Sequence, residues 1–222
     1  CLLSRGLGDV YKRQFTDCDD TIAINRIEVT EELLDYDPII FNDLNVTNES
    51  GVVKEKNYFS NRLKDKSLIN SNDFLHSNMM GLSNAATTNI VLSKIINNIK
   101  NRTIIAFDWL LWTYAINNGY QAKFTNSTTT NYRVYPKNIA GLPQPINKES
   151  VLRGLAIKEQ HYYELSSYNE QYSHLYKILS AANKKSQDKQ WLNEYMLALE
   201  ENRIEYPLWW ENIKEPKQVG II

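Results

Sequence analysis

The sequence has few cysteines, no strong charge bias and no long hydrophobic run, and each absence excludes a class of protein. Two cysteines in 222 residues cannot frame a disulfide-rich secreted scaffold. Lysine and arginine number 25 against 26 for aspartate and glutamate, and this balance argues against a nucleic-acid-binding protein. No apolar run approaches the ~18 residues that cross a bilayer. The remaining composition is that of an ordinary globular protein, for which we predict the α/β or α class and a cytoplasmic location.

The first fourteen residues, CLLSRGLGDVYKRQ, do not read as the start of a protein. They lack an initiator Met and the basic and apolar regions of a signal peptide. They resemble the translated sequencing-adaptor peptides that contaminate metagenomic reading frames, and we predict that residues 1–14 are such an artefact. A natural extension of a partial gene is the alternative. Without this segment only Cys18 remains, so no intramolecular disulfide is expected.

Hydrophobic periodicity predicts an α/β part followed by a helical part. In the first part, short apolar or alternating runs predict strands, and spacings of three and four predict helices. We expect strands at 38–41, 120–124 and 128–135, and helices at 22–35, 90–99 and 108–118, the last closed by Gly119.

From residue 149 the pattern is helical. One apolar helix face is predicted to run from Leu165 to Leu179, and a second helix around 192–199 is predicted to stop before Pro207. We therefore expect a helical hairpin, followed by an aromatic tail around Leu208-Trp-Trp210.

The sharpest local feature is the acidic turn Phe15-Thr-Asp-Cys-Asp-Asp20. Three carboxylates within four residues repel one another, and a bound divalent cation relieves that repulsion. Hard oxygen ligands suit Mg²⁺ or Mn²⁺, and either ion can hold a diphosphate. A solvated turn without a ligand is the alternative.

Two other segments carry candidate functional residues. Asp108 opens an apolar helix, where the helix dipole favours a carboxylate, so it is either a first-turn residue or a general base near a pocket. Arg133 lies near the end of the strand predicted at 128–135 and Lys137 just after it, and they either contact phosphate oxygens or lie at a solvated strand end.

Taken in order, these segments resemble glycosyltransferase family 2, of the kind that builds bacterial surface polysaccharides. The resemblance covers about residues 15–142. The family has an acidic turn, a helix with Asn and a basic residue, an apolar strand ending in Asp, a turn with Gly, an Asn and a Gly before small residues, an Asp-Trp helix start, and a Tyr-Arg-x-His-x-x-Asn-x-x-Gly motif. The matching positions are Phe15–Asp20, Asn25 and Arg26, Ile39–Asp43, Asn48–Gly51, Asn78 and Gly81, Asp108 and Trp109, and then Tyr132, Arg133, Asn138 and Gly141.

This resemblance implies a GT-A (Rossmann-like) nucleotide-diphospho-sugar transferase fold and an inverting transfer of a hexosyl or deoxyhexosyl group. The substrates would be a nucleotide-sugar donor and a polysaccharide or lipid-linked acceptor, used in the cytoplasm at the inner face of the membrane, with peripheral membrane association. The implied residues are Asp17, Asp19 and Asp20 for the donor diphosphate, Asp19 and Asp20 for Mg²⁺ or Mn²⁺, Asp108 as catalytic base, and Arg133, Tyr135 and Asn138 in the pocket.

The sequence departs from the family pattern in two ways. Tyr135 stands where the family has His, and a phenol with a pKa of ~10 is a poor ligand for a hard cation, which weakens the metal site. The family's first βα units, which bind the nucleotide, are missing before Phe15. We therefore predict that residues 15–148 are the acceptor-side part of a GT-A domain, that 149–222 form the helical hairpin and aromatic tail, and that this fragment is inactive alone.

Two other functions remain open. Asp17-Cys-Asp19-Asp-Thr21 also fits the Asp-x-Asp-x-Thr motif of haloacid-dehalogenase-like phosphatases, with Asp17 as nucleophile and Asp19 as acid/base, although that family's later Gly-Asp-x-x-x-Asp loop is not found. Alternatively, the chain is a non-catalytic interaction module whose aromatic tail is the contact surface, or whose Trp209 and Trp210 rest on a membrane.

Overall fold

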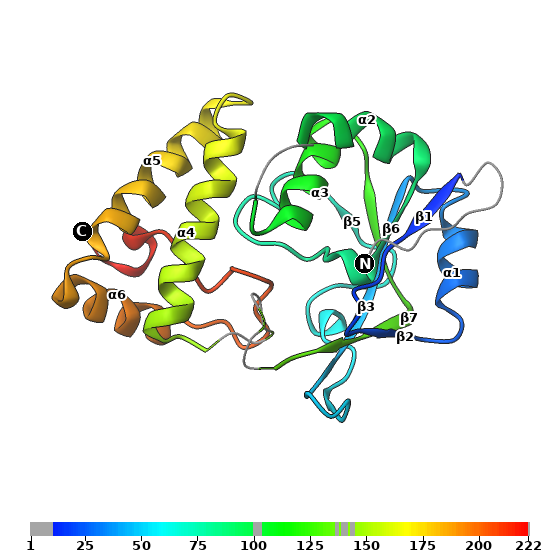
Figure 1. Cartoon of the computed structure of the whole chain (residues 1–222), viewed down its shortest axis with the longest axis horizontal. Helices are drawn as coiled ribbons and strands as arrows, with labels where there is room; N and C mark the ends of the chain where they lie inside the picture. The colour runs from blue at the N-terminus through cyan, green and yellow to red at the C-terminus, as the bar shows by residue number, and fades with distance from the viewer. Residues whose placement is uncertain (1–10, 100–103, 136–137, 139–141, 143–144, 222) are drawn as a thin grey trace. The chain divides into compact units, whose positions relative to one another are not determined.

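The computed structural model describes residues 11–99, 104–135, 138, 142 and 145–221. The fold is mixed α/β, as predicted, and the chain divides into two compact units (Figure 1). The sheet unit comprises Cys1–Leu75, Met79–Arg102 and Asp108–Ile139, and the helical unit comprises His76–Asn78, Thr103–Phe107 and Ala140–Ile222. In the described part of the chain, every helix is too short or too polar to cross a bilayer.

The sheet unit is built on a mixed sheet in which β3 and β7 run parallel and the other described strand pairs run antiparallel. The strand order is β1-β6-β3-β7-β2, with β4 paired to β3 and β5 paired to β7. The strands are β1 (Lys12–Gln14), β2 (Thr21–Ile22), β3 (Ile39–Thr47), β4 (Val53–Glu55), β5 (Leu68–Ile69), β6 (Ala85–Thr88) and β7 (Ala122–Arg133). Strand β1 lies within residues 1–14, and the sequencing-adaptor origin of that segment stays a prediction.

Strand β3 is longer than predicted because polar residues continue it. Ile40 forms a core cluster with Leu34 and Ala86, which explains the apolar run. Beyond that run, Asp43 is fully buried. Its Oδ1 accepts the Leu44 and Phe59 amides, both at 2.8 Å, and burial raises the pKa of this carboxyl. Hydrogen bonds of Asp43 therefore add to the burial of Leu44 and Val46 in the second half of the strand.

The two strands predicted between 120 and 135 are one strand, β7. In the pairing with β3, Asn42 lies opposite Thr125 and Asp43 lies opposite Thr129, so residues 126–128 bulge out. Asn25 fills this bulge, since its Nδ2 donates to the Ser127 carbonyl and its Oδ1 accepts from the Thr128 hydroxyl. The bulge at residues 126–128 lies where the two predicted strands were separated, and the chain continues through it as one strand.

Three predicted helices flank the sheet, and α1 and α3 lie on opposite sides of it in Figure 1. Nearly the whole circumference of α3 is buried, and Gly119 follows it with φ of +85°, as expected of a C-cap. The helices are α1 (Arg26–Leu33), α2 (Asn89–Ile99) and α3 (Phe107–Asn117), with short 3-10 helices η1 (Phe59–Asn61) and η2 (Leu82–Asn84).

The helical unit contains three long helices where a hairpin was predicted. They are α4 (Lys148–Leu165), α5 (Glu170–Lys185) and α6 (Lys189–Glu201), with a final 3-10 turn η3 (Pro216–Val219). The single apolar face predicted from 165 to 179 is therefore wrong. The chain leaves the helix after Leu165, and Asn169 starts α5 by accepting the Tyr172 amide. An N-cap asparagine overrides the hydrophobic spacing.

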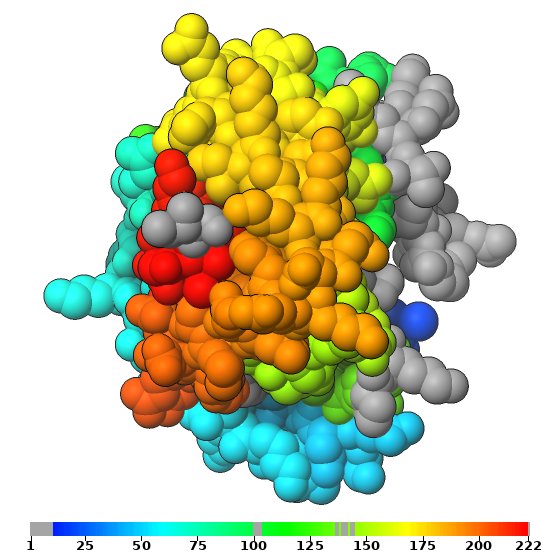
Figure 2. Space-filling model, turned by 90° about the vertical axis from the view of Figure 1, so that its left-hand side faces the viewer, coloured from blue at the N-terminus to red at the C-terminus, as the bar shows by residue number. Residues whose placement is uncertain are grey.

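The aromatic tail is part of the helical unit's core. Leu208, Trp209 and Trp210 are all buried, and Asn78 and Trp209 exchange two backbone hydrogen bonds of 3.0 Å. This burial argues against an exposed tryptophan anchor or contact surface. Residues of α4, α5, α6 and the C-terminal segment, coloured yellow-green to red, are visible on the face of the helical unit in Figure 2.

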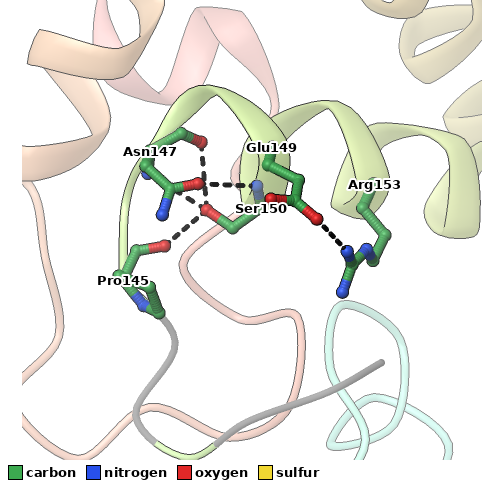
Figure 3. Close-up of polar contacts among 5 residues, drawn as sticks. All are labelled: Pro145, Asn147, Glu149, Ser150 and Arg153. Carbon is green, nitrogen blue, oxygen red and sulfur yellow. Dashed lines mark hydrogen bonds and ion pairs between the residues drawn. The ribbon is translucent and has the colours of Figure 1, made fainter. Parts of the chain in front are cut away.

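Helix α4 begins with a capping box around Asn147 (Figure 3). Asn147 Oδ1 accepts the Ser150 amide at 2.9 Å, and the Ser150 hydroxyl accepts the Asn147 amide at 3.0 Å. We expect Asn147→Ala to lower the free energy of unfolding by about 1 kcal/mol, because an orphan helix amide loses its acceptor. Denaturant unfolding followed by circular dichroism measures this loss.

The control is Arg153→Ala on the same helix. It removes an exposed i,i+4 ion pair with Glu149, for which only a few tenths of a kcal/mol are expected. Equal losses in the two variants would contradict the role of the cap.

Candidate functional site

The acidic turn connects β1 to β2, and its carboxylates differ in depth. Asp17 is exposed, Asp19 is half-buried and Asp20 is buried. The turn is closed by the Asp20 amide, which donates to the Asp17 carbonyl at 3.3 Å. It is tied to η2 by the Asp17 amide, which donates to Ser83 Oγ at 2.9 Å. The acidic turn predicted at Phe15–Asp20 therefore lies between two short strands.

Asp20 meets the far end of β7. Its Oδ1 accepts the Arg133 amide at 2.8 Å, across 113 positions of sequence. Its Oδ2 is buried and has no hydrogen-bond partner within the described residues. Burial raises the pKa of Asp20 to about 6, against the lowering effect of the Ser83 hydroxyl and the Arg133 amide. A carboxylate oxygen this poorly solvated favours a cationic or hydrogen-donating ligand.

Asp19 accepts a hydrogen bond from Tyr135, which stands where the motif of the resembled family has His. The hydrogen bond to Asp19 and that carboxylate's charge raise the pKa of the phenol, so Tyr135 stays protonated at neutral pH. A protonated phenol orients a carboxylate and does not ligate a metal. The structure thus gives Tyr135 a different task from that of a metal-binding histidine.

The segment after β7 is folded by Asn138. Its Oδ1 accepts the Tyr135 amide at 3.0 Å, and its Nδ2 donates to the Arg133 carbonyl at 2.8 Å. Asn138 therefore fixes the backbone of Arg133 and Tyr135. Arg133 Nε is buried without a hydrogen-bond partner in the described part of the chain. Lys137 and Gly141 lie outside the described residues.

Asp108 lies in the first turn of α3, as predicted, and its Oδ1 accepts the Trp109 amide at 2.7 Å. Trp112 follows one helical turn later and so shares its face. The ring of Trp112 contacts the ring of Phe15 edge to face, with centroids 6.3 Å apart. The face of α3 that carries Asp108 and Trp112 therefore packs against Phe15, the first residue of the acidic turn.

Ser83, which was not predicted, and Arg26, whose burial was not predicted, both bind the acidic turn. Ser83 binds the Asp17 amide, but a lone serine in a small-residue stretch carries no sequence signal. Arg26 is fully buried beneath the turn. The family pattern marked it as a basic residue on a helix, but it did not indicate burial.

The acidic turn suits a cation held jointly with a ligand. Across the described residues, no three His, Cys, Asp or Glu side chains are grouped to hold a metal ion. Mg²⁺ commonly takes one or two carboxylates, with substrate phosphates and water completing its shell. The partnerless oxygen of Asp20 and the partnerless nitrogen of Arg133 fit that arrangement, because one attracts a cation and the other an anion.

Comparison of the chain with protein-family models and with curated proteins finds no match. The family resemblance described above therefore rests on its motifs alone.

Proposed function

We propose that this chain carries the acceptor-side part of an inverting, GT-A type glycosyltransferase that moves a sugar from a nucleotide-sugar to a polysaccharide or lipid-linked acceptor. One observation carries the proposal: Asp19, Asp20, Arg133 and Tyr135, from segments more than a hundred positions apart, meet at one place. The ordered motifs imply Asp19 and Asp20, together with Asp17, for the donor diphosphate, and they imply Arg133 and Tyr135 for the pocket beside it.

Each residue has a separate task in the proposed site. Asp20 and Asp19 attract the cation that accompanies the diphosphate, and Tyr135 holds Asp19 in orientation. The Arg133 guanidinium donates to a phosphate oxygen. A bound Mg²⁺ or Mn²⁺ would supply charge neutralisation for the leaving diphosphate.

Asp108 is the proposed general base. A carboxylate at the start of α3 accepts the proton of the acceptor hydroxyl as that oxygen attacks the anomeric carbon. The bond from the anomeric carbon to the diphosphate oxygen breaks, and the diphosphate leaves with the bonding electrons. Attack on the side opposite the leaving group inverts the anomeric configuration.

The proposal is tested with Mn²⁺ and pyrophosphate, because pyrophosphate needs no contacts to a base or ribose. We expect the electron paramagnetic resonance signal of free Mn²⁺ to fall when the chain and pyrophosphate are added together. Asp20→Asn keeps an acceptor for the Arg133 amide but loses the charge, so the affinity should fall about tenfold or more.

The matched control is Glu49→Gln, which removes one negative charge from an exposed turn of the same unit. It should bind Mn²⁺ and pyrophosphate as the unaltered chain does. A chain that binds no Mn²⁺, or an Asp20→Asn variant that binds as well as the control, would refute the diphosphate site.

A further inference from the structure

The side chain of Arg26 lies beneath the acidic turn. It is 0% exposed, although it begins α1 and charged residues are almost never fully buried unless they are paired. Its donors are directed to four acceptors. Nε donates to Asn42 Oδ1 at 2.9 Å, Nη1 to the Phe15 carbonyl at 3.2 Å and Thr16 Oγ1 at 3.4 Å, and Nη2 to the Ala85 carbonyl at 3.3 Å.

These contacts join three parts of the sheet unit. Asn42 lies on β3, Ala85 begins β6, and Phe15 and Thr16 lead directly into the acidic turn. Nη1 of Arg26 binds both the main-chain carbonyl of Phe15 and the side-chain hydroxyl of Thr16. A planar guanidinium can bind several such acceptors at once because its donors point in fixed directions. A lysine has one donor nitrogen and cannot span the same acceptors.

The charge of Arg26 is retained despite its burial. Desolvation lowers the pKa of the guanidinium to about 10, and the nearby Asp20 charge opposes that shift. At neutral pH the group is therefore cationic, while its hydrogen-bonded acceptors are uncharged carbonyl, amide and hydroxyl groups. The negative charge that balances it lies in the turn above.

We propose that Arg26 is the positioning residue of the acidic turn: it fixes Phe15 and Thr16 against β3 and β6, and its charge holds the carboxylates where Asp20 meets the Arg133 amide. The functional part of this inference rests on the proposed diphosphate site. The geometric part does not, since the hydrogen bond between Asp20 and the Arg133 amide is measurable without any ligand.

The geometric part is tested by amide hydrogen exchange in Arg26→Gln. We expect the Arg133 and Asp17 amides, which donate to Asp20 and Ser83, to exchange about tenfold faster or more. Arg26→Lys keeps the charge but spans fewer acceptors, so about a threefold increase is expected. If Arg26→Gln does not fold, Arg26→Lys provides the result alone.

The control is Asp43→Asn, which alters another fully buried ionisable residue of the same sheet. Asp43 accepts the Leu44 and Phe59 amides and has no described hydrogen bond to the turn, so those two amides should exchange faster while Arg133 and Asp17 are unchanged. Equal acceleration of Arg133 and Asp17 in the Arg26 and Asp43 variants would overturn the inference, because it would show general loosening.

Binding of Mn²⁺ with pyrophosphate separates the two proposals. We expect about a tenfold loss of affinity in Arg26→Gln, partial recovery in Arg26→Lys and no loss in Asp43→Asn. If the unaltered chain binds no Mn²⁺, the proposed function fails, and the exchange data still decide the geometric role. If it binds and Arg26→Gln binds equally well, the positioning role in ligand binding is refuted.

Discussion

Replacement of Asp108 by asparagine is expected to lower sugar transfer by about 10²- to 10⁴-fold while leaving donor binding unchanged. Asparagine preserves the size of the side chain and can accept the Trp109 amide in place of the carboxylate. It cannot accept a proton from the acceptor hydroxyl. The loss should therefore appear in kcat and not in the affinity for the donor.

The measurement is release of nucleoside diphosphate from a panel of nucleotide-sugars, in the longer protein that the family resemblance predicts. Asp108→Glu keeps a base but moves it by one methylene, so it should retain partial activity. Glu49→Gln, at an exposed carboxylate of the sheet unit, is the control and should transfer normally. Full transfer by Asp108→Asn would remove Asp108 from the base role. Loss of donor binding would instead indicate a structural one.

Raising the pH from 7 to 9.5 is expected to stabilise the helical unit by about 3 kcal/mol, through Lys158. This residue of α4 is 3% exposed, and its Nζ donates to the Ile213 carbonyl. Burial lowers its pKa from 10.5 to about 7, against the opposing charges of Glu211 and Glu215.

The sign follows from proton binding. Between pH 7 and about 10.5 the unfolded chain holds a proton on Lys158 and the folded chain does not, so rising pH favours the folded state. His161 lies in the same core, and burial and the Lys158 charge lower its pKa well below 6.5. Stability should therefore fall further as the pH drops below about 6.5.

Denaturant unfolding at several pH values, followed by circular dichroism, measures this dependence. Lys158→Met keeps the length of the side chain without the ionisable amine, so its stability should be nearly constant from pH 7 to 9.5. Lys177→Met removes an exposed lysine of α5 and should keep the full dependence. The interpretation is wrong if the unaltered chain shows no change in stability over this range.

The sequence by itself determined the α/β class, most helices of the sheet unit and the two most informative acidic features. The apolar spacing of α2 and α3 and the C-cap at Gly119 are local signals, and they survive folding because each is satisfied within a few residues. The acidic turn could be identified from its three carboxylates within four residues, and Asp108 from its charge at the start of an apolar helix.

Only the tertiary structure decided how these pieces meet. The two strands predicted between 120 and 135 form the single strand β7 because Asn25 fills the bulge, and β3 extends past Phe41 because Asp43 accepts amides that include one from η1. The guanidinium of Arg26 lies under the acidic turn for the same kind of reason. Long-range hydrogen bonds between polar side chains leave no periodicity in the sequence, and their partners become known only once the chain is folded.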